Sequence, residues 1–191
     1  MNPLHPPARS TAFPTPFGTI RLAWSRQPSG ARVTRILLPD DPRAGREEFP
    51  PEIPPDGIED TGISALICDI RSFLLGKDVA FGTGILDLSR CPPFQQRVLL
   101  AEHAIPRGCV STYGRIARHI GVPGGARAVG TALANNPFPL VIPCHRALRA
   151  DGSPGGFQGG TEMKVRLLAM EGASFRPDRK VRMDRVWYDN V

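Results

Sequence analysis

The chain has 191 residues, 41% of them apolar, which is enough for one ordinary domain or two small ones with a real core. It contains 20 glycines and 21 prolines, so short elements joined by many loops are expected and a long coiled coil is excluded. The N-terminus lacks the apolar run of a signal peptide, and no stretch is apolar enough to span a membrane. We therefore predict a soluble, cytoplasmic protein.

The net charge of +6 is concentrated in the second half of the chain. Residues 1–86 carry 9 basic and 10 acidic side chains, whereas residues 87–191 carry 15 and 8. Of the 15 basic groups, 13 are arginines, which bind phosphate bidentately and suit a polyanion such as nucleic acid. Charge alone is equally compatible with a basic surface that only faces solvent.

Residues 1–86 predict a small α/β domain. Apolar and polar side chains alternate over residues 17–25 and again over 31–39, which indicates a β-hairpin with one buried face. Residues 39–62 hold 6 prolines and 8 acidic side chains, so we expect a loosely held loop. Apolar residues then keep helical spacing over residues 63–74, which predicts a helix that ends at Gly76.

A second domain is predicted over residues 87–172, ahead of a basic tail at 173–191 that is either disordered or packed as an extra edge. Its first helix covers residues 94–105. Its last helix covers residues 161–172, with Thr161 placed to cap it and Gly172 to end it.

Two short helices between these, over residues 112–121 and 125–136, flank a tight turn and have the layout of a helix-turn-helix. One face of the second helix combines Arg127 with Gly130, Thr131 and other small residues. Such a face lets the helix backbone approach either a neighbouring helix or a nucleic-acid groove, and the basic composition favours the groove.

Cys144 follows the apolar run Leu140–Ile142, which is typical of a buried strand, and a stiffening proline. The four cysteines show no paired spacing, so we expect free thiols, without a disulfide framework or a structural zinc site. By position alone, Cys144 is either an inert buried residue or a nucleophile. His145 could act as its base and Glu171 could orient that histidine, as in nucleophile, base and acid triads.

The segments "FQQRVLL", "IPRGCVSTYGRIA" and "GARAVGTALANNPFPLVIPCHRALRADGSPGGFQGGTEMKVRLLAMEG" resemble O6-alkylguanine-DNA alkyltransferases in order and spacing. The resemblance covers about residues 87–172, and the preceding region is similar to the weaker N-terminal domain of that family. It implies an α/β two-domain fold: a β-hairpin-plus-helix domain, then a mainly helical, winged-helix-like domain with a helix-turn-helix.

The implied function is single-turnover DNA repair, in which the alkyl group of O6-alkylguanine, or of O4-alkylthymine as a second substrate, moves irreversibly onto Cys144 of a monomer. The partner is duplex DNA bound through the minor groove and phosphates, the lesion base is flipped out, and no cofactor, metal or membrane is involved. The resemblance assigns catalytic roles to Cys144, His145, Glu171, Asn136 and Tyr113. It assigns DNA contacts to Arg127, Ala126, Gly130, Thr131, Gln95 and Gly114, and the alkylguanine pocket to Leu133, Ala147, Phe157 and Gln158.

Two positions depart from the common pattern of the family. Phe157 stands where many members have tyrosine, which removes a hydroxyl group that could bind the base, and Ala147 replaces a common valine. Other functional classes stay open on the residues alone. They are a sensor that binds alkylated DNA without transfer, a helix-turn-helix regulator, and a cysteine hydrolase, for which no oxyanion hole can be located.

Overall fold

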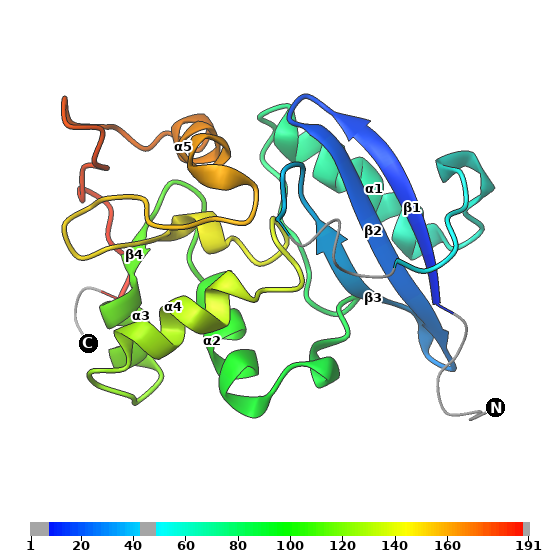
Figure 1. The fold of residues 1–191 in the computed structure, drawn as a ribbon, viewed down its shortest axis with the longest axis horizontal. Coiled ribbons are helices and arrows are strands. Elements are labelled where there is room, and N and C mark those ends of the chain that lie inside the picture. The colour runs from blue at the N-terminus through cyan, green and yellow to red at the C-terminus, as the bar shows by residue number, and fades with distance from the viewer. Residues whose placement is uncertain (1–7, 43–48, 189–191) are drawn as a thin grey trace. The chain divides into compact units, whose positions relative to one another are not determined.

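A computed structural model describes residues 8–42 and 49–188 of the chain, which divides into two compact units, Met1–Arg90 and Cys91–Val191 (Figure 1). The N-terminal unit contains β1 (Ala8–Thr15), β2 (Gly18–Gln27), β3 (Gly30–Leu37), η1 (Pro55–Gly57), α1 (Thr61–Leu74) and η2 (Leu88–Arg90). The C-terminal unit contains α2 (Pro93–His103), β4 (Ser111–Thr112), α3 (Tyr113–His119), α4 (Ala126–Ala134), η3 (Cys144–Arg146), β5 (Ala147–Leu148) and α5 (Gly160–Met170). In the described ranges, no helix is both long and apolar enough to cross a bilayer.

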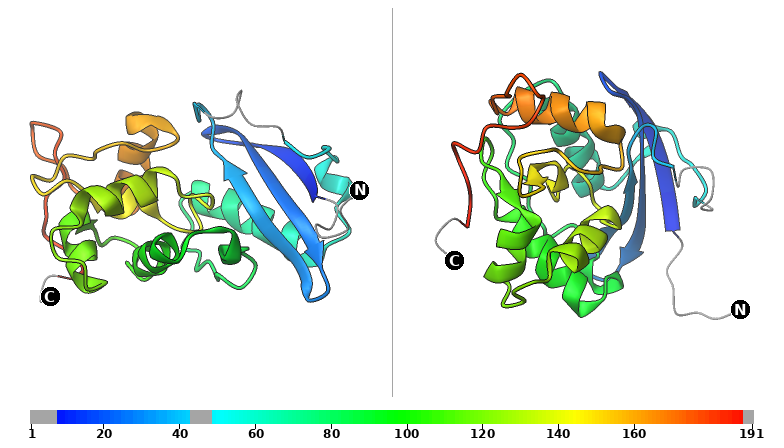
Figure 2. Two further views of the ribbon diagram at one scale, coloured as in Figure 1. Left: turned by 60° about the horizontal axis from the view of Figure 1, so that its bottom comes forward. Right: turned by 60° about the vertical axis from the view of Figure 1, so that its left-hand side comes forward.

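The N-terminal unit is an antiparallel sheet in the order β1-β2-β3, with α1 lying along one face (Figure 2). Alternating strand residues such as Ile20 and Leu22 are buried, as are the residues of α1 at helical spacing. The carboxylate of Asp60 caps α1 by accepting from the backbone amides of Gly62 and Ile63. The hairpin and the helix are therefore found as predicted from sequence.

Two features of this unit correct the sequence-based expectations. β1 is a third strand that was not predicted, and it pairs with β2 over its full length. The proline-rich stretch is not loosely held where it passes β1, because Ser10 exchanges backbone hydrogen bonds with Pro51 and Ile53. Residues 43–48 of that stretch lie outside the described residues.

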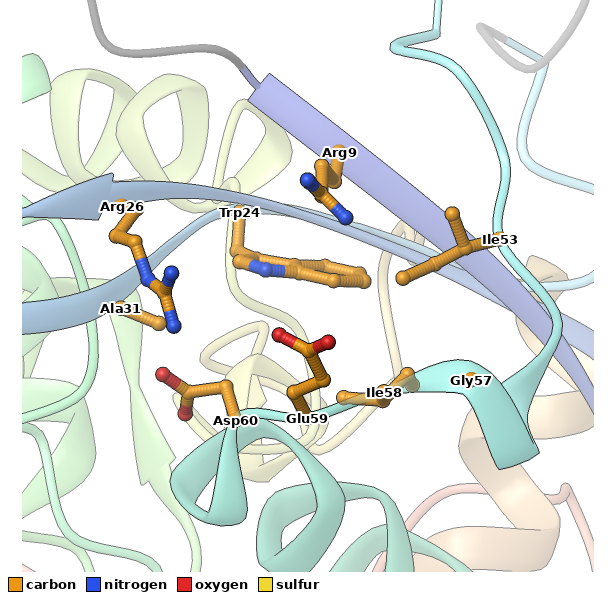
Figure 3. Close-up of a pocket in the computed structure, with 9 residues that line it drawn as sticks. All are labelled: Arg9, Trp24, Arg26, Ala31, Ile53, Gly57, Ile58, Glu59 and Asp60. Carbon is orange, nitrogen blue, oxygen red and sulfur yellow. The ribbon is translucent and has the colours of Figure 1, made fainter.

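A cavity of about 160 Å³ lies in the N-terminal unit around Trp24, between the strands and the segment just ahead of α1 (Figure 3). Its polar lining comes from two arginines of the strands and two carboxylates just ahead of α1. The complete lining is Arg9, Trp24, Arg26, Ala31, Ile53, Gly57, Ile58, Glu59 and Asp60. None of these residues was predicted to take part in catalysis or DNA binding.

In the C-terminal unit, α2, α3 and α4 pack together, and β4 pairs in parallel with the short strand β5. The three helices bury Val98, Leu99, Ile116 and Val129 on the faces that they turn towards one another. α5 begins without a side-chain cap, because Gly159 holds the capping position and Thr161 is already the second helical residue. The predicted cap at Thr161 is therefore wrong, whereas Gly172 ends the helix with a φ of 90°.

The segment 173–188 after α5 packs as an extra edge, one of the two possibilities left by the sequence. Val110 donates a backbone hydrogen bond to Arg185 and accepts one from Trp187. Its apolar contacts centre on a small cluster formed by Val110, Leu148, Leu168 and Val181. Residues 189–191 of the predicted tail lie outside the described part of the chain.

Candidate active site

Cys144 is the first residue of η3 and is held by a tight turn that follows α4. The amide of Ile142 donates to the carbonyl of Phe138 at 2.8 Å, and Leu140 adopts a φ of 74°. A left-handed conformation is unusual for a branched residue and cannot continue a strand. The strand expected at residues 140–142 is therefore wrong, although all three side chains are buried as predicted.

Asn136 connects this turn to the thiol. Its side-chain amide donates to the carbonyl of Ile142 at 3.1 Å and to Sγ of Cys144 at 3.3 Å. Its side-chain oxygen accepts from the amide of Phe138 at 2.9 Å. Asn136 is fully buried, so one side chain fixes both the path of the backbone and the position of Sγ.

The thiol of Cys144 is 5% exposed, and burial raises its pKa to about 11. The hydrogen bond from Asn136 acts in the opposite direction, because it stabilises the thiolate. Cys144 is therefore a neutral thiol at neutral pH and needs a base in order to react. All four cysteines are free thiols, as predicted.

His145 and Glu171 meet in a buried relay beside Cys144. Nε2 of His145 lies 3.0 Å from Oε1 of Glu171. Burial lowers the pKa of His145 and keeps the imidazole neutral, so that it can accept a proton. Burial alone would favour the neutral acid of Glu171, but His145 and Arg146 outweigh it and lower its pKa to about 2. The relay therefore pairs a neutral imidazole with a carboxylate.

Arg146 completes this relay, and the sequence analysis did not assign it a role. Its Nε and Nη2 atoms donate to the two oxygens of Glu171 at 2.9 and 2.7 Å, and Nη1 donates to the carbonyl of Ile105. This bidentate pair fixes the plane of the carboxylate that faces His145. Its position directly after His145, two residues from the thiol, is the sequence feature that could have identified it.

Two further charged residues near the thiol were also missed. Glu102 on α2 and Lys164 on α5 are both fully buried. Each occupies a position with helical spacing to apolar core residues, Leu99 for Glu102 and Leu168 for Lys164. A charged residue at a core-spaced position is uncommon, and that pattern could have identified both.

The predicted pocket residues lie around the same segment. Leu133 and Ala147 are buried, and the ring centroid of Phe157 lies 6.3 Å from that of His145, edge to face. Gln158 is buried and donates to the carbonyls of Ala134 and Asn136, so its amide ties the glycine-rich loop to the end of α4.

Tyr113 begins α3, and its hydroxyl group lies against Gly155 of the glycine-rich loop. A Cβ atom at Gly155 would come within 2.8 Å of that oxygen, and the φ of 73° there also disfavours other residues. Burial and the charges of Glu102 and Cys144 raise the pKa of Tyr113 to about 12. Its hydroxyl group therefore stays protonated at neutral pH and can donate a hydrogen bond.

The helix-turn-helix geometry is formed by α3 and α4, with Val129, Ala132 and Leu133 buried. Arg127, Thr131 and Ala134 are exposed on the opposite face, and Ala126 and Gly130 are half-buried. Arg127 and Thr131 are therefore exposed on one face, as their spacing predicted, whereas Gly130, expected beside them, is only half-exposed. The side-chain amide of Gln95 donates to the carbonyls of Ala132 and Asn135, so it holds the end of α4, while Gly114 is half-buried in α3.

Residues 93–173 match the family model described as "6-O-methylguanine DNA methyltransferase, DNA binding domain". The chain is 49% identical over 112 residues to a methylated-DNA--protein-cysteine methyltransferase of Methanothermobacter thermautotrophicus, covering 59% of this chain and 62% of that protein. It is 37% identical over 114 residues to the protein of the same name from Mycobacterium leprae, covering 59% of this chain and 67% of that protein.

Solved structures extend the similarity to both units. The Mycobacterium tuberculosis OGT in complex with DNA has a TM-score of 0.68 and 32% identity, covering 85% of this chain and 92% of that chain. The O6-methylguanine-DNA methyltransferase from Pyrococcus kodakaraensis, at 23% identity and a TM-score of 0.56, shows the shared α/β fold alone. By its sequence and by its fold, this chain belongs to the O6-methylguanine-DNA methyltransferase family.

Proposed function

We propose that this chain repairs alkylated DNA by direct reversal, transferring an alkyl group from O6 of guanine, or from O4 of thymine, to Cys144. The observation that carries the proposal is the buried thiol, bonded by Asn136 beside the His145–Glu171–Arg146 relay. A neutral imidazole and a fixed carboxylate can take up the thiol proton as the sulfur reacts.

The reaction is a single displacement. The thiol proton passes towards His145, directly or through one water, and the imidazolium that forms is stabilised by Glu171. Sγ of Cys144 then attacks the alkyl carbon, the bond from that carbon to the guanine oxygen breaks, and its electron pair stays on the base. A thioether forms on Cys144, and the hydroxyl group of Tyr113 donates a hydrogen bond to the guanine that leaves. Because a thioether is not hydrolysed, each molecule reacts once.

Base flipping explains why the DNA contacts are proposed on α4. The alkyl carbon is inaccessible inside the duplex, so the nucleotide must leave the stack at a cost of a few kcal/mol. We assign Arg127 to the vacated space, and Ala126, Gly130 and Thr131 to the floor of the minor groove. Gly114 and the backbone near Gln95 are assigned to phosphates. The C-terminal unit would then act as a winged-helix-like reader, in a cytoplasmic protein that works as a monomer.

Phe157 and Ala147 shape the proposed pocket. The ring of Phe157 can stack on or wall the flipped base but cannot donate a hydrogen bond to it. Ala147 leaves more room than a valine would. We therefore expect weaker recognition of the base because of Phe157, and easier acceptance of alkyl groups larger than methyl because of Ala147.

Intact-mass spectrometry after incubation with a duplex that contains O6-methylguanine tests the proposal. We expect the wild type to gain the mass of one methylene group, located on the Cys144 peptide, and Cys144→Ser to gain none. Cys109→Ser is the matched control and should react like the wild type, and an undamaged duplex should transfer nothing. A wild type that binds the damaged duplex and stays unmodified would instead be a sensor.

A further inference from the structure

A second carboxylate, that of Glu102, is buried close to the active segment and takes no part in the relay. Its side chain is 0% exposed, and neither oxygen has a hydrogen-bond partner of normal geometry within residues 8–42 and 49–188. The backbone amide of Ala147, three residues after Cys144, is directed at it. An ionised carboxylate with so little compensation is costly, so burial raises the pKa of Glu102 to about 8.

Lys164 is the buried cation of the same region. Its side chain is 0% exposed, and Nζ donates to the carbonyl of Ala147 at 2.6 Å. Burial lowers the pKa of Lys164 to about 8, although the negative charges of Cys144 and Glu102 oppose that change. The backbone of Ala147 therefore lies between a potential anion and a potential cation.

These two groups act in opposite directions on Cys144. The charge of an ionised Glu102 raises the pKa of the thiol, and the charge of Lys164 lowers it. The other ionisable groups that face Glu102 are Arg146 of η3, Tyr113 of α3 and Tyr188 of the C-terminal segment. Arg146 is already engaged by both oxygens of Glu171, so the balance at the thiol depends on Glu102 and Lys164.

We propose that Glu102 is a positioning residue that stays protonated at neutral pH, so that the charge of Lys164 stabilises the thiolate of Cys144 as it forms, without an opposing anion. Glu102 neither gives nor accepts the thiol proton, which passes to His145. When Glu102 ionises at alkaline pH, its charge raises the pKa of the thiol, and Lys164, which loses its proton over the same range, no longer opposes it. The thiol of Cys144 is then less reactive than it would be beside a neutral side chain at position 102. The inference rests on the proposed alkyl transfer for its biological meaning, but thiol reactivity can be measured without DNA.

Glu102→Gln mimics the protonated acid at every pH, and the reaction of Cys144 with iodoacetamide reports the effect. The rate is followed on the Cys144 peptide by mass spectrometry from about pH 6 to about pH 10. We expect equal rates for wild type and variant at the acidic end and a variant faster by on the order of tenfold at the alkaline end, as for a pKa difference of one unit. A ratio that stays constant across the range would show a merely structural role and overturn the inference.

Two further variants sharpen the result. Glu162→Gln on the exposed start of α5 is the matched control, and its rate profile should coincide with that of the wild type. Lys164→Met keeps the length of the side chain but removes the ammonium group, so we expect a slower reaction at neutral pH. An unchanged rate in Lys164→Met would contradict the assigned role of that charge.

The wild type gives a test that does not depend on the variant folding. With ¹³C-labelled glutamate side chains, one buried carboxyl carbon should titrate well above the ordinary glutamate range. Titration of every glutamate within the ordinary range would overturn the inference. A protein that shows the iodoacetamide profile but transfers no methyl group from damaged DNA would contradict the proposed function and leave this inference standing.

Discussion

Arg146 and Glu171, 25 positions apart in the chain, form a bidentate ion pair that places the carboxylate against the imidazole of His145. The Nε and Nη2 atoms of Arg146 lie 2.9 and 2.7 Å from the two oxygens of Glu171. The side chains are 11% and 2% exposed, so the pair is shielded from solvent. Geometry of this kind holds one rotamer of the carboxylate and therefore one orientation of His145.

Arg146→Met should break this pair and leave the buried charge of Glu171 with, among the described residues, only the neutral imidazole of His145 as a partner. Removing one partner of a buried ion pair costs about 3 kcal/mol, so we expect a loss of that size in the free energy of unfolding, together with slower alkyl transfer. Urea denaturation and single-turnover kinetics measure the two effects. Arg179→Met is the control, because its pair with Glu162 is 75% and 73% exposed and should change neither quantity noticeably. Equal stability losses in both variants would contradict the assignment.

The pKa of Glu171 predicts how stability depends on pH. Its pKa falls from 4.5 in the unfolded chain to about 2 in the folded protein, so its ionised form favours the folded state at neutral pH. That contribution is fully present above pH 4.5 and is lost as the pH falls towards 2. The difference in unfolding free energy between wild type and Glu171→Gln should shrink through this window. A difference that is independent of pH would show that the carboxylate is not stabilised by its partners.

Asn136→Ala should affect both the fold and the thiol. It leaves the buried amide of Phe138 without its partner and removes one of the two donors to the carbonyl of Ile142, at a cost of about 2 kcal/mol in unfolding free energy. It also removes a donor to Sγ of Cys144, so the thiol pKa rises and iodoacetamide reacts more slowly. The side chain of the neighbouring Asn135 is exposed and donates to the carbonyl of Thr131 within α4, so Asn135→Ala should keep the wild-type reactivity. A slow Asn135→Ala would mean that loosening of α4 causes both effects.

Arg127→Ala should separate DNA binding from thiol chemistry. Arg127 is exposed on α4, away from the buried thiol, so its loss should weaken binding of duplex DNA on the order of tenfold while free O6-methylguanine base reacts as before. Fluorescence anisotropy and mass spectrometry give the two readouts. Arg90→Ala removes the same charge from the N-terminal unit and serves as the control. An equal loss of reaction with the free base would refute the role given to Arg127.

Two adjacent glycines provide a test of the position of Tyr113. Gly155→Ala adds a Cβ atom 2.8 Å from the tyrosine oxygen and strains a φ of 73°, which costs about 1 kcal/mol. We expect Tyr113 to move and alkyl transfer from DNA to slow. A Cβ atom at Gly156 meets nothing within 4 Å, so Gly156→Ala should react at the rate of the wild type. Equal slowing in both would point to loop flexibility instead of Tyr113.

Sequence periodicity predicted most of the elements, and its failure at β1 has a physical cause. Ser10 and Thr11 are buried polar residues of that strand, and Pro14, near its end, is exposed. Consecutive buried positions hide the alternation that marks a strand. The hydroxyl group of Ser10 finds its partner far along the chain, because it donates to the carbonyl of Pro50. No local pattern encodes that bond.

Residues of the candidate site could be predicted when their side-chain chemistry suggested a role. Residues whose role depends on tertiary contacts could not. Cys144, His145 and Glu171 were selected because a thiol needs a base and a base needs an orienting acid, and the structure brings His145 and Glu171 to 3.0 Å. The roles of Arg146 and Lys164 arise from contacts across 25 and 17 positions. The turn at Leu140 was missed because three consecutive apolar residues predict a buried strand, and nothing in their sequence indicates the positive φ of Leu140.

The segment after α5 also covers backbone groups that a second copy of this protein could otherwise pair with. Hydrogen bonds from Val110 to Arg185 and from Trp187 to Val110 occupy the backbone groups just ahead of β4, and the hydroxyl group of Ser111 donates to Trp187. An uncovered edge there would be a template for strand addition by a second chain and hence for aggregation. The covering segment removes that template by occupying the backbone groups of Val110.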